Sequence, residues 1–81
     1  MSIRREGSVI HLEGHCPVED AETLTALLES EGGWTVELSQ CRQVHTALVQ
    51  ALIRFRPAMR GAPDDAFLRE MIIPALRAAD A

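Results

Sequence analysis

The residues best suited to carry chemistry are His45 and Thr46, at the junction between a predicted loop and a predicted helix. A threonine hydroxyl can accept a phosphoryl group, and a histidine can titrate near neutral pH. Thr46 precedes Gln50 and Arg54 by four and eight residues, so these three side chains share one helix face. With Gln43 and His45, they form a candidate surface for a partner protein. The alternative is that Thr46 only caps the helix and that His45 is an ordinary solvated residue.

A second group combines two histidines and two cysteines. His15-Cys16 ends one predicted strand, and Cys41 and His45 follow another. If these strands are parallel neighbours, two thiolates and two imidazoles would suit tetrahedral zinc, although the spacing is not that of a standard zinc finger. Cys16 at a helix start would favour a thiolate, and hence redox sensing. The alternative is ordinary packing of two free thiols, and we assign neither a metal nor another cofactor.

The candidate surface depends on a strand, a loop and a helix. Trp34, Val36 and Leu38 alternate with polar residues, which predicts a strand over residues 34–38. The polar stretch over 39–43 predicts a turn. Apolar residues then recur at helical spacing as far as Phe55, and Pro57 ends the pattern.

The flanking segments supply the other elements. Residues 2–5 and 9–12 predict two strands, and Pro17 opens a helix that stops before Gly32-Gly33. Residues 58–62 predict a short strand. Asp64 or Asp65 then caps a last helix, in which Pro74 introduces a kink or an end. The order ββαβαβα predicts one α/β domain over residues 1–81, with a mixed four-stranded sheet and three helices.

Composition narrows the classes of function. The chain has 81 residues and a net charge of −4, and its eight basic residues are scattered arginines, which argues against nucleic-acid binding. No run approaches the roughly 20 apolar residues of a membrane span, and the N-terminus lacks a signal-peptide core, so we expect a cytoplasmic protein. No nucleophile, base and orienting group occur together, so we expect no enzyme. Homodimerisation through the 59–62 edge or the last helix stays open.

The layout and the central segment resemble the STAS domain of bacterial anti-sigma factor antagonists. In that family, a strand ending in a hydrophobic–Asp–hydrophobic–Ser pattern leads to an Asp-Ser-Ser-Gly or Asp-Ser-Thr-Gly motif at a helix start. Residues 36–39 here read Val-Glu-Leu-Ser, with Glu37 in place of the Asp. Thr46 falls on the phosphorylated position, and Gly14 resembles a glycine common after the second strand.

The rest of the motif departs from that pattern. His45 stands where the family has Asp, Ala47 replaces the second hydroxyl residue, and Leu48 replaces the Gly. The similarity covers most of the chain as far as Phe55 and is weaker beyond it. The resemblance implies a small non-enzymatic switch in signal transduction and transcription regulation. Its unphosphorylated form binds an anti-sigma factor that is also a Ser/Thr kinase, and phosphorylation of Thr46 releases that partner.

Two other functions stay open. One is a constitutive adaptor that uses the same surface in a signalling or lipid-transport assembly, without phosphorylation. The other is a metal or redox sensor built from His15, Cys16, Cys41 and His45. A phosphate on Thr46 separates the switch from the adaptor, whereas bound zinc would favour the sensor.

Overall fold

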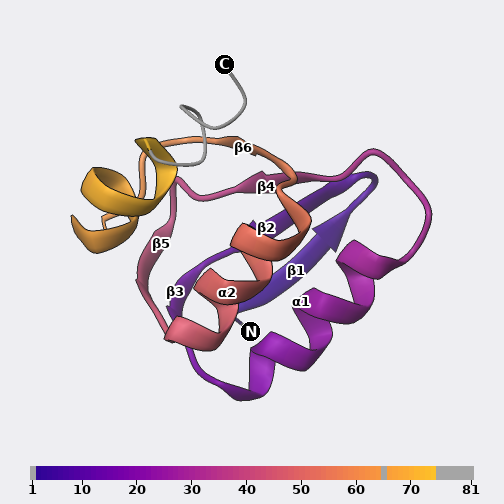
Figure 1. Ribbon diagram of the computed structural model, residues 1–81, viewed down its shortest axis with the longest axis horizontal. Helices are drawn as coiled ribbons and strands as arrows, with labels where there is room; N and C mark the ends of the chain where they lie inside the picture. The colour runs from indigo at the N-terminus through magenta and orange to yellow at the C-terminus, as the bar shows by residue number, and fades with distance from the viewer. Residues whose placement is uncertain (1, 65, 75–81) are drawn as a thin grey trace.

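The computed structural model describes residues 2–64 and 66–74, in which helices cover one face of a sheet (Figure 1). The main sheet consists, in spatial order, of β1 (Ile3–Glu6), β2 (Val9–Leu12), β4 (Thr35–Glu37) and β6 (Ala58–Arg60). β1 is antiparallel to β2, whereas β2, β4 and β6 run parallel to one another. The predicted mixed four-stranded sheet is therefore confirmed.

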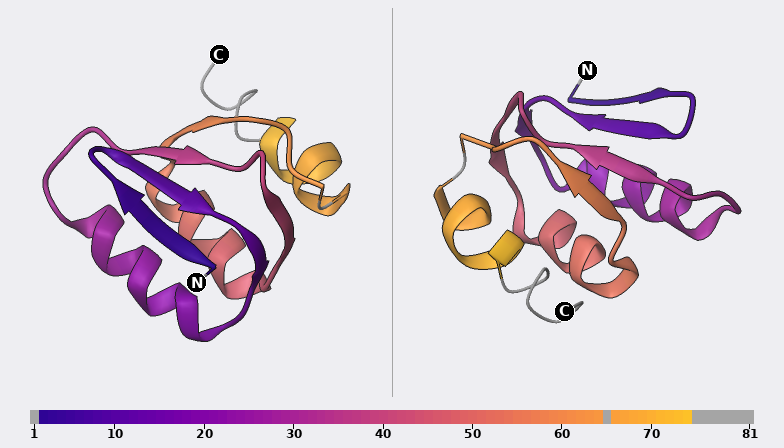
Figure 2. Two further views of the ribbon diagram at one scale, coloured as in Figure 1. Left: turned by 180° about the vertical axis from the view of Figure 1, so that it is seen from behind. Right: turned by 90° about the horizontal axis from the view of Figure 1, so that it is seen from above.

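Three helical segments accompany the sheet. Helices α1 (Glu19–Glu29) and α2 (Thr46–Phe55) lie side by side on the same face of the sheet, and η1 (Leu68–Ile72) lies beyond its end (Figure 2). Helix α1 is shorter than predicted, because it starts two residues after Pro17 and ends before Ser30. Across residues 2–64 and 66–74, no helix is both long and apolar enough to cross a membrane.

Two further strands lie outside the main sheet. β3 (Gly14–Cys16) and β5 (Cys41–Val44) form a parallel pair, so the turn predicted over residues 39–43 is wrong beyond Gln40. Gly14 pairs with Cys41 and Cys16 pairs with Val44, with a register shift after Gly14. This shift leaves two consecutive polar residues exposed in β5 and breaks the alternation by which a strand is recognised. The chain therefore has two strands, β3 and β5, that the predicted order ββαβαβα lacks.

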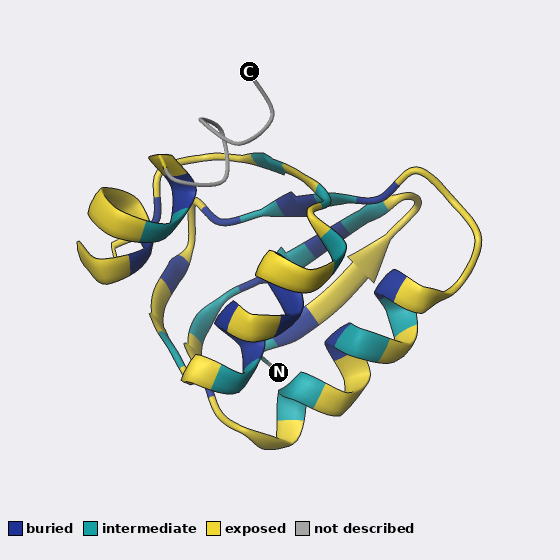
Figure 3. Ribbon diagram, in the orientation of Figure 1, coloured by how far each residue is buried: buried dark blue, intermediate teal, exposed yellow. Residues whose placement is uncertain are grey.

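The core lies between the main sheet and the two helices. Trp34, Val36 and Leu38 are all buried, as their alternation predicts, and α2 contributes a buried stripe (Figure 3). The buried hydrophobic residues are Ile3, Ile10, Leu12, Cys16, Leu24, Leu28, Trp34, Val36, Leu38, Cys41, Leu48, Val49, Ala51, Leu52, Leu68 and Ile73. Members of this list come from every element except β6, so one core joins both sheets to the helices.

The other face of the main sheet carries a row of charged and polar side chains. The strand register places Arg4, His11, Glu37 and Arg60 side by side across all four strands. Glu37 accepts hydrogen bonds from Arg60 Nε and from the backbone N–H of Ser39. The hydrogen bond from Arg60 is the main reason that the pKa of Glu37 falls to about 2. Among the described residues, this outer face of the main sheet thus carries charged side chains that form ion pairs, and no helix packs against it.

The last helical segment is a π-helix over Leu68–Ile72, within helical residues 66–74. The backbone N–H of Ile73 donates to the carbonyl of Leu68, five residues earlier. A proline ring clashes with the carbonyl four residues before it in a regular α-helix, and the wider π turn relieves this clash ahead of Pro74. The predicted cap at Asp65 and the chain beyond Pro74 lie outside the described residues.

Gly61 follows β6 and lies close to Glu37 and Ser39 at the end of β4. A substitution at Gly61 therefore tests this packing. The φ of Gly61 is +86°, and an added Cβ would meet the Glu37 carboxylate and lie 2.7 Å from the backbone nitrogen of Ser39. We predict that Gly61→Ala lowers the free energy of unfolding in urea by about 2–3 kcal/mol. Gly7→Ala is the matched control, because Gly7 also has a positive φ (+62°) but has nothing within 4 Å of the added Cβ. Equal losses for the two variants would contradict the proposed contact.

Candidate functional site

The candidate surface is centred on the turn from β5 into α2. His45 has an extended backbone, with φ −68° and ψ 146°, and is the N-cap residue of α2. Its Nδ1 accepts a hydrogen bond from the backbone N–H of Ala47, at 3.0 Å. The suggestion that Thr46 caps the helix is therefore wrong, because Thr46 is the first helical residue and the preceding histidine makes the cap.

Thr46 itself is accessible. Its side chain is exposed, and within residues 2–64 and 66–74 no hydrogen bond of its hydroxyl is found. The first turn of α2 contains no acidic residue, so the positive end of the helix dipole is not neutralised there. The hydroxyl therefore stands in a place where an added phosphate would be tolerated by the fold.

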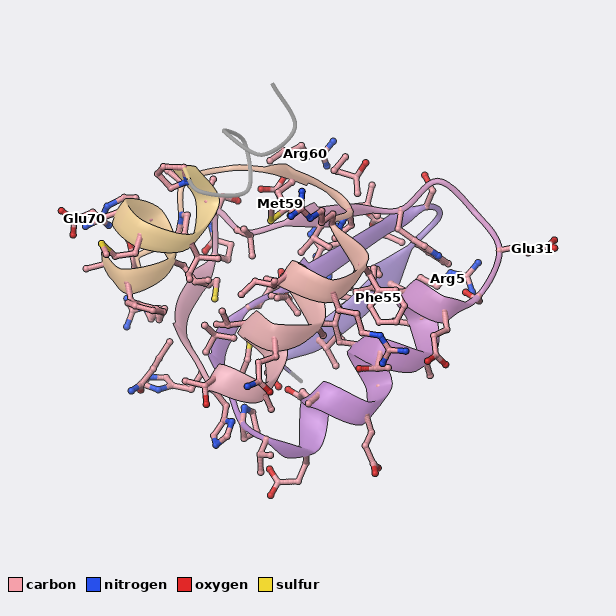
Figure 4. The ribbon with its side chains drawn as sticks, viewed as in Figure 1. Arg5, Glu31, Phe55, Met59, Arg60 and Glu70 are labelled. Atoms are coloured by element: carbon pink, nitrogen blue, oxygen red, sulfur yellow. The ribbon has the colours of Figure 1, made fainter. Side chains whose placement is uncertain are left out.

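The predicted face of α2 is confirmed as an exposed surface. Gln50 and Arg54 are exposed one and two turns after Thr46, and Ile53 adds an apolar group that is 44% exposed. The Arg54 guanidinium lies 4.9 Å from the centroid of the Phe55 ring, close enough for a cation–π contact. Phe55 lies where α2 faces α1 (Figure 4). Arg54 is thus held near the boundary between the two helices.

Two depressions border this turn. The strand-end hollow, of about 330 Å³, is lined by His15, Cys16, Pro17, Gln43, Val44 and His45. The interhelical groove, of about 260 Å³, is lined by Thr25, Ala47, Gln50, Ala51, Arg54 and Phe55. Thr46 follows a residue of the hollow and precedes a residue of the groove. Four of the five residues predicted to bind a partner line one of the two depressions, and Thr46 lies between them in the chain.

The structure adds lining residues that the sequence did not indicate. Pro17 and Val44 lie in the hollow, and Thr25 lies in the groove. The sequence could have indicated Pro17 and Val44 only if residues 41–44 had been recognised as a strand, because the pairing of Cys16 with Val44 brings them to the hollow. Thr25 has no such local signal, because its place depends on how α1 packs against α2.

The four candidate metal ligands are not brought to one point. β3 and β5 are indeed parallel neighbours, but Cys16 and Cys41 point into the core while His15 and His45 are exposed. His15 Nδ1 lies 2.8 Å from Gln43 Oε1. Within the described ranges, no three or more histidine, cysteine, aspartate or glutamate residues are placed to hold a metal ion.

The two cysteines are buried thiols that do not form a disulfide. A hydrogen bond to the Cys41 thiol, together with burial, raises the pKa of the Cys16 thiol. The expectation that the start of α1 favours a Cys16 thiolate is therefore wrong, because the side chain turns into the core rather than toward the helix N-terminus. This environment is that of a structural cysteine rather than a redox sensor.

Comparison with known proteins returned no match to a protein-family model, a curated protein or a solved structure.

The cap on α2 leads to a prediction about stability. His45→Ala should lower the free energy of unfolding by about 1 kcal/mol, because it leaves the N–H of Ala47 without its acceptor. His45→Asn should retain most of that stability, since an asparagine oxygen can accept the same bond. Thr46→Ala should change the unfolding free energy by less than about 0.5 kcal/mol. Urea titration of the three variants checks the assignment, and a larger loss for Thr46→Ala than for His45→Ala would contradict it.

The buried thiols lead to a prediction about reactivity. In the folded protein, both cysteines should react with 5,5′-dithiobis(2-nitrobenzoic acid) at least about 100-fold more slowly than in urea, because neither thiol is exposed and the pKa of Cys16 is raised. The urea-unfolded chain, which has two cysteines, is the control and should release two equivalents of thionitrobenzoate. Rapid release of one equivalent from the folded protein would show that one thiol is accessible.

Proposed function

We propose that this protein is a small regulatory interaction domain of the anti-sigma factor antagonist type. It acts in the cytoplasm and binds a partner protein through the outer face of α2 and the end of β5. The partner is an anti-sigma factor of the Ser/Thr kinase class, and phosphorylation of Thr46 releases it. The support consists of the resemblance in residues 36–39 and 46, together with the position of the exposed Thr46 in the chain, between residues that line two depressions.

The observation that carries the proposal is the division of roles between His45 and Thr46. The imidazole makes the helix cap, so the neighbouring hydroxyl has no structural task that a modification would disturb. An exposed hydroxyl of this kind is open to the active site of a kinase. A purely structural threonine at a helix start would instead use its oxygen as the cap.

The phosphate would act on the partner rather than on the fold. It would add a charge of about −1.5 to −2 at the N-terminus of α2, where free N–H groups and the helix dipole favour an anion. No acidic side chain in the first turn of α2 opposes it. The domain therefore stays folded, while a partner packed against the same turn meets a new, hydrated charge that it must displace or desolvate.

A constitutive adaptor that uses the same surface is the second candidate. It is favoured by Leu48, which is fully buried in the core at the position where the resembled family has glycine. The hydroxyl residue after the phosphorylated position is also absent, because Ala47 stands there. Such a protein would hold its partner by the same contacts, without release by a kinase.

Phosphopeptide mapping separates the two candidates. We expect protein isolated from its own cells to carry a phosphatase-sensitive addition on Thr46. We also expect Thr46→Glu to reduce recovery of the co-purifying partner at least about tenfold, and Thr46→Ala to retain it. Thr23→Glu is the matched control, because it places the same charge on another exposed threonine, in α1. Equal recovery of the partner with all variants, together with an unmodified Thr46 under every growth condition, would refute the switch and favour the constitutive adaptor.

A further inference from the structure

The charged residues of this chain are separated along the sequence. Residues 6–37 contain eight acidic side chains and no lysine or arginine, whereas residues 38–63 contain four arginines and no acidic side chain. The first range includes α1, and the second, which we call the acid-free segment, includes β5, α2 and β6. The acidic α1 and the basic α2 lie side by side (Figure 1). The net charge of −4 therefore conceals a basic region that coincides with the candidate surface.

Two arginines of the acid-free segment are exposed and are not neutralised by a carboxylate. Among the described residues, neither Arg42 of β5 nor Arg54 of α2 forms an ion pair. Arg60, by contrast, is paired with Glu37. Arg54 follows Thr46 by eight residues on the same helix face, which is about 12 Å along the axis, and Arg42 precedes Thr46 by four residues. Two positive charges thus flank Thr46 in the chain.

We propose that the partner protein presents an acidic surface whose carboxylates pair with Arg42 and Arg54. This inference rests on the proposed function, because it assumes that a partner binds the outer face of α2 and the end of β5. A phosphate on Thr46 would add a charge of about −1.5 to −2 to a surface on which these two arginines carry +2. It would cancel most of the attraction for an acidic partner, whereas it would strengthen the binding of a basic one. An acidic partner thus accounts both for the unpaired arginines and for release by phosphorylation.

Two other acidic occupants are less suited to this surface. A second copy of the chain could place its acidic α1 on this α2, but two chains that each carry a net charge of −4 repel one another. Nucleic acid carries a dense row of phosphates, which the acidic residues over 6–37 would repel. A protein surface that offers a few carboxylates matches two exposed arginines without either cost.

The test uses hexaglutamate with blocked termini as the acidic probe and the complete ¹⁵N-labelled chain, at an ionic strength of about 0.02 M. We expect saturable amide shifts centred on residues 42–54, with a millimolar dissociation constant, because exposed ion pairs are individually weak. Raising the ionic strength to about 0.3 M should weaken binding at least about fivefold, since salt screens exposed charges. Hexaglutamine, which lacks only the charges, should cause no localised shift. Absent or dispersed shifts with hexaglutamate, or shifts centred on Arg4 and Arg5, would overturn the proposal.

Substitutions separate the effect of charge from that of shape. Arg42→Gln and Arg54→Gln should each weaken hexaglutamate binding at least about threefold. Arg42→Lys and Arg54→Lys should keep it within about twofold, because lysine retains the positive charge. Thr46→Glu should weaken binding at least about threefold more than Thr23→Glu, which adds the same charge to α1 instead. Equal binding by the Gln and Lys variants, or by the two Glu variants, would overturn the assignment.

This test can be separated from that of the switch. Hexaglutamate binding requires neither the partner nor a phosphate on Thr46. If hexaglutamate does not bind while Thr46→Glu still releases the partner, the acidic partner surface is refuted and the switch is retained. If hexaglutamate binds at residues 42–54 and Thr46 is never modified, the switch is refuted and the acidic partner surface is retained. Self-association of the chain through α1 and α2 without the peptide would overturn the proposal in favour of a second copy.

Discussion

The parallel pairing of β3 with β5 is the constraint on which the candidate surface depends. The backbone N–H of Gly14 donates to the carbonyl of Gln40 at 2.8 Å, and that of His45 donates to the carbonyl of Cys16 at 2.9 Å. These bonds lie at the two ends of the pair and fix the point at which the chain enters α2. The same pairing brings Cys16 and Cys41 into the core and leaves His15 and Gln43 on the surface, within hydrogen-bond distance of each other. The helix cap, the strand-end hollow and the position of Thr46 all follow from it.

The main sheet and its helices provide a rigid support for this turn. Leu48 and Leu52 of α2 are fully buried against the sheet, so the helix cannot rotate without exposing them. Packing also decides which residues of α2 face solvent, because Thr46, Gln50 and Arg54 lie opposite the apolar side of the helix. On the far side of the sheet, the row of Arg4, His11, Glu37 and Arg60 makes the described surface charged and polar rather than apolar.

Periodicity in the sequence predicted those elements in which buried apolar residues recur at regular spacing. The alternation around Val36 identified β4, and the spacing of Leu48, Leu52 and Phe55 identified α2, because each reports directly which side is buried. β5 was missed because its register shift exposes Arg42 and Gln43 in succession, so the pattern is that of a turn. The identity of the cap was missed for a different reason. A histidine nitrogen can replace a threonine oxygen as an acceptor, and only the backbone geometry decides between the two residues.

His45 belongs both to the cap of α2 and to the lining of the strand-end hollow, and this couples two equilibria. Its Nδ1 accepts a hydrogen bond from the N–H of Ala47 in the first turn of α2, and the same residue lines the strand-end hollow. If a bound ligand restrains the His45 ring, the ring loses less conformational freedom when it caps the helix, and the reverse also holds. Occupancy of the hollow and order at the start of α2 are therefore thermodynamically linked. A partner bound there would raise the melting temperature of the domain. Conversely, a phosphate that stiffens the same turn would alter partner affinity even without touching the partner.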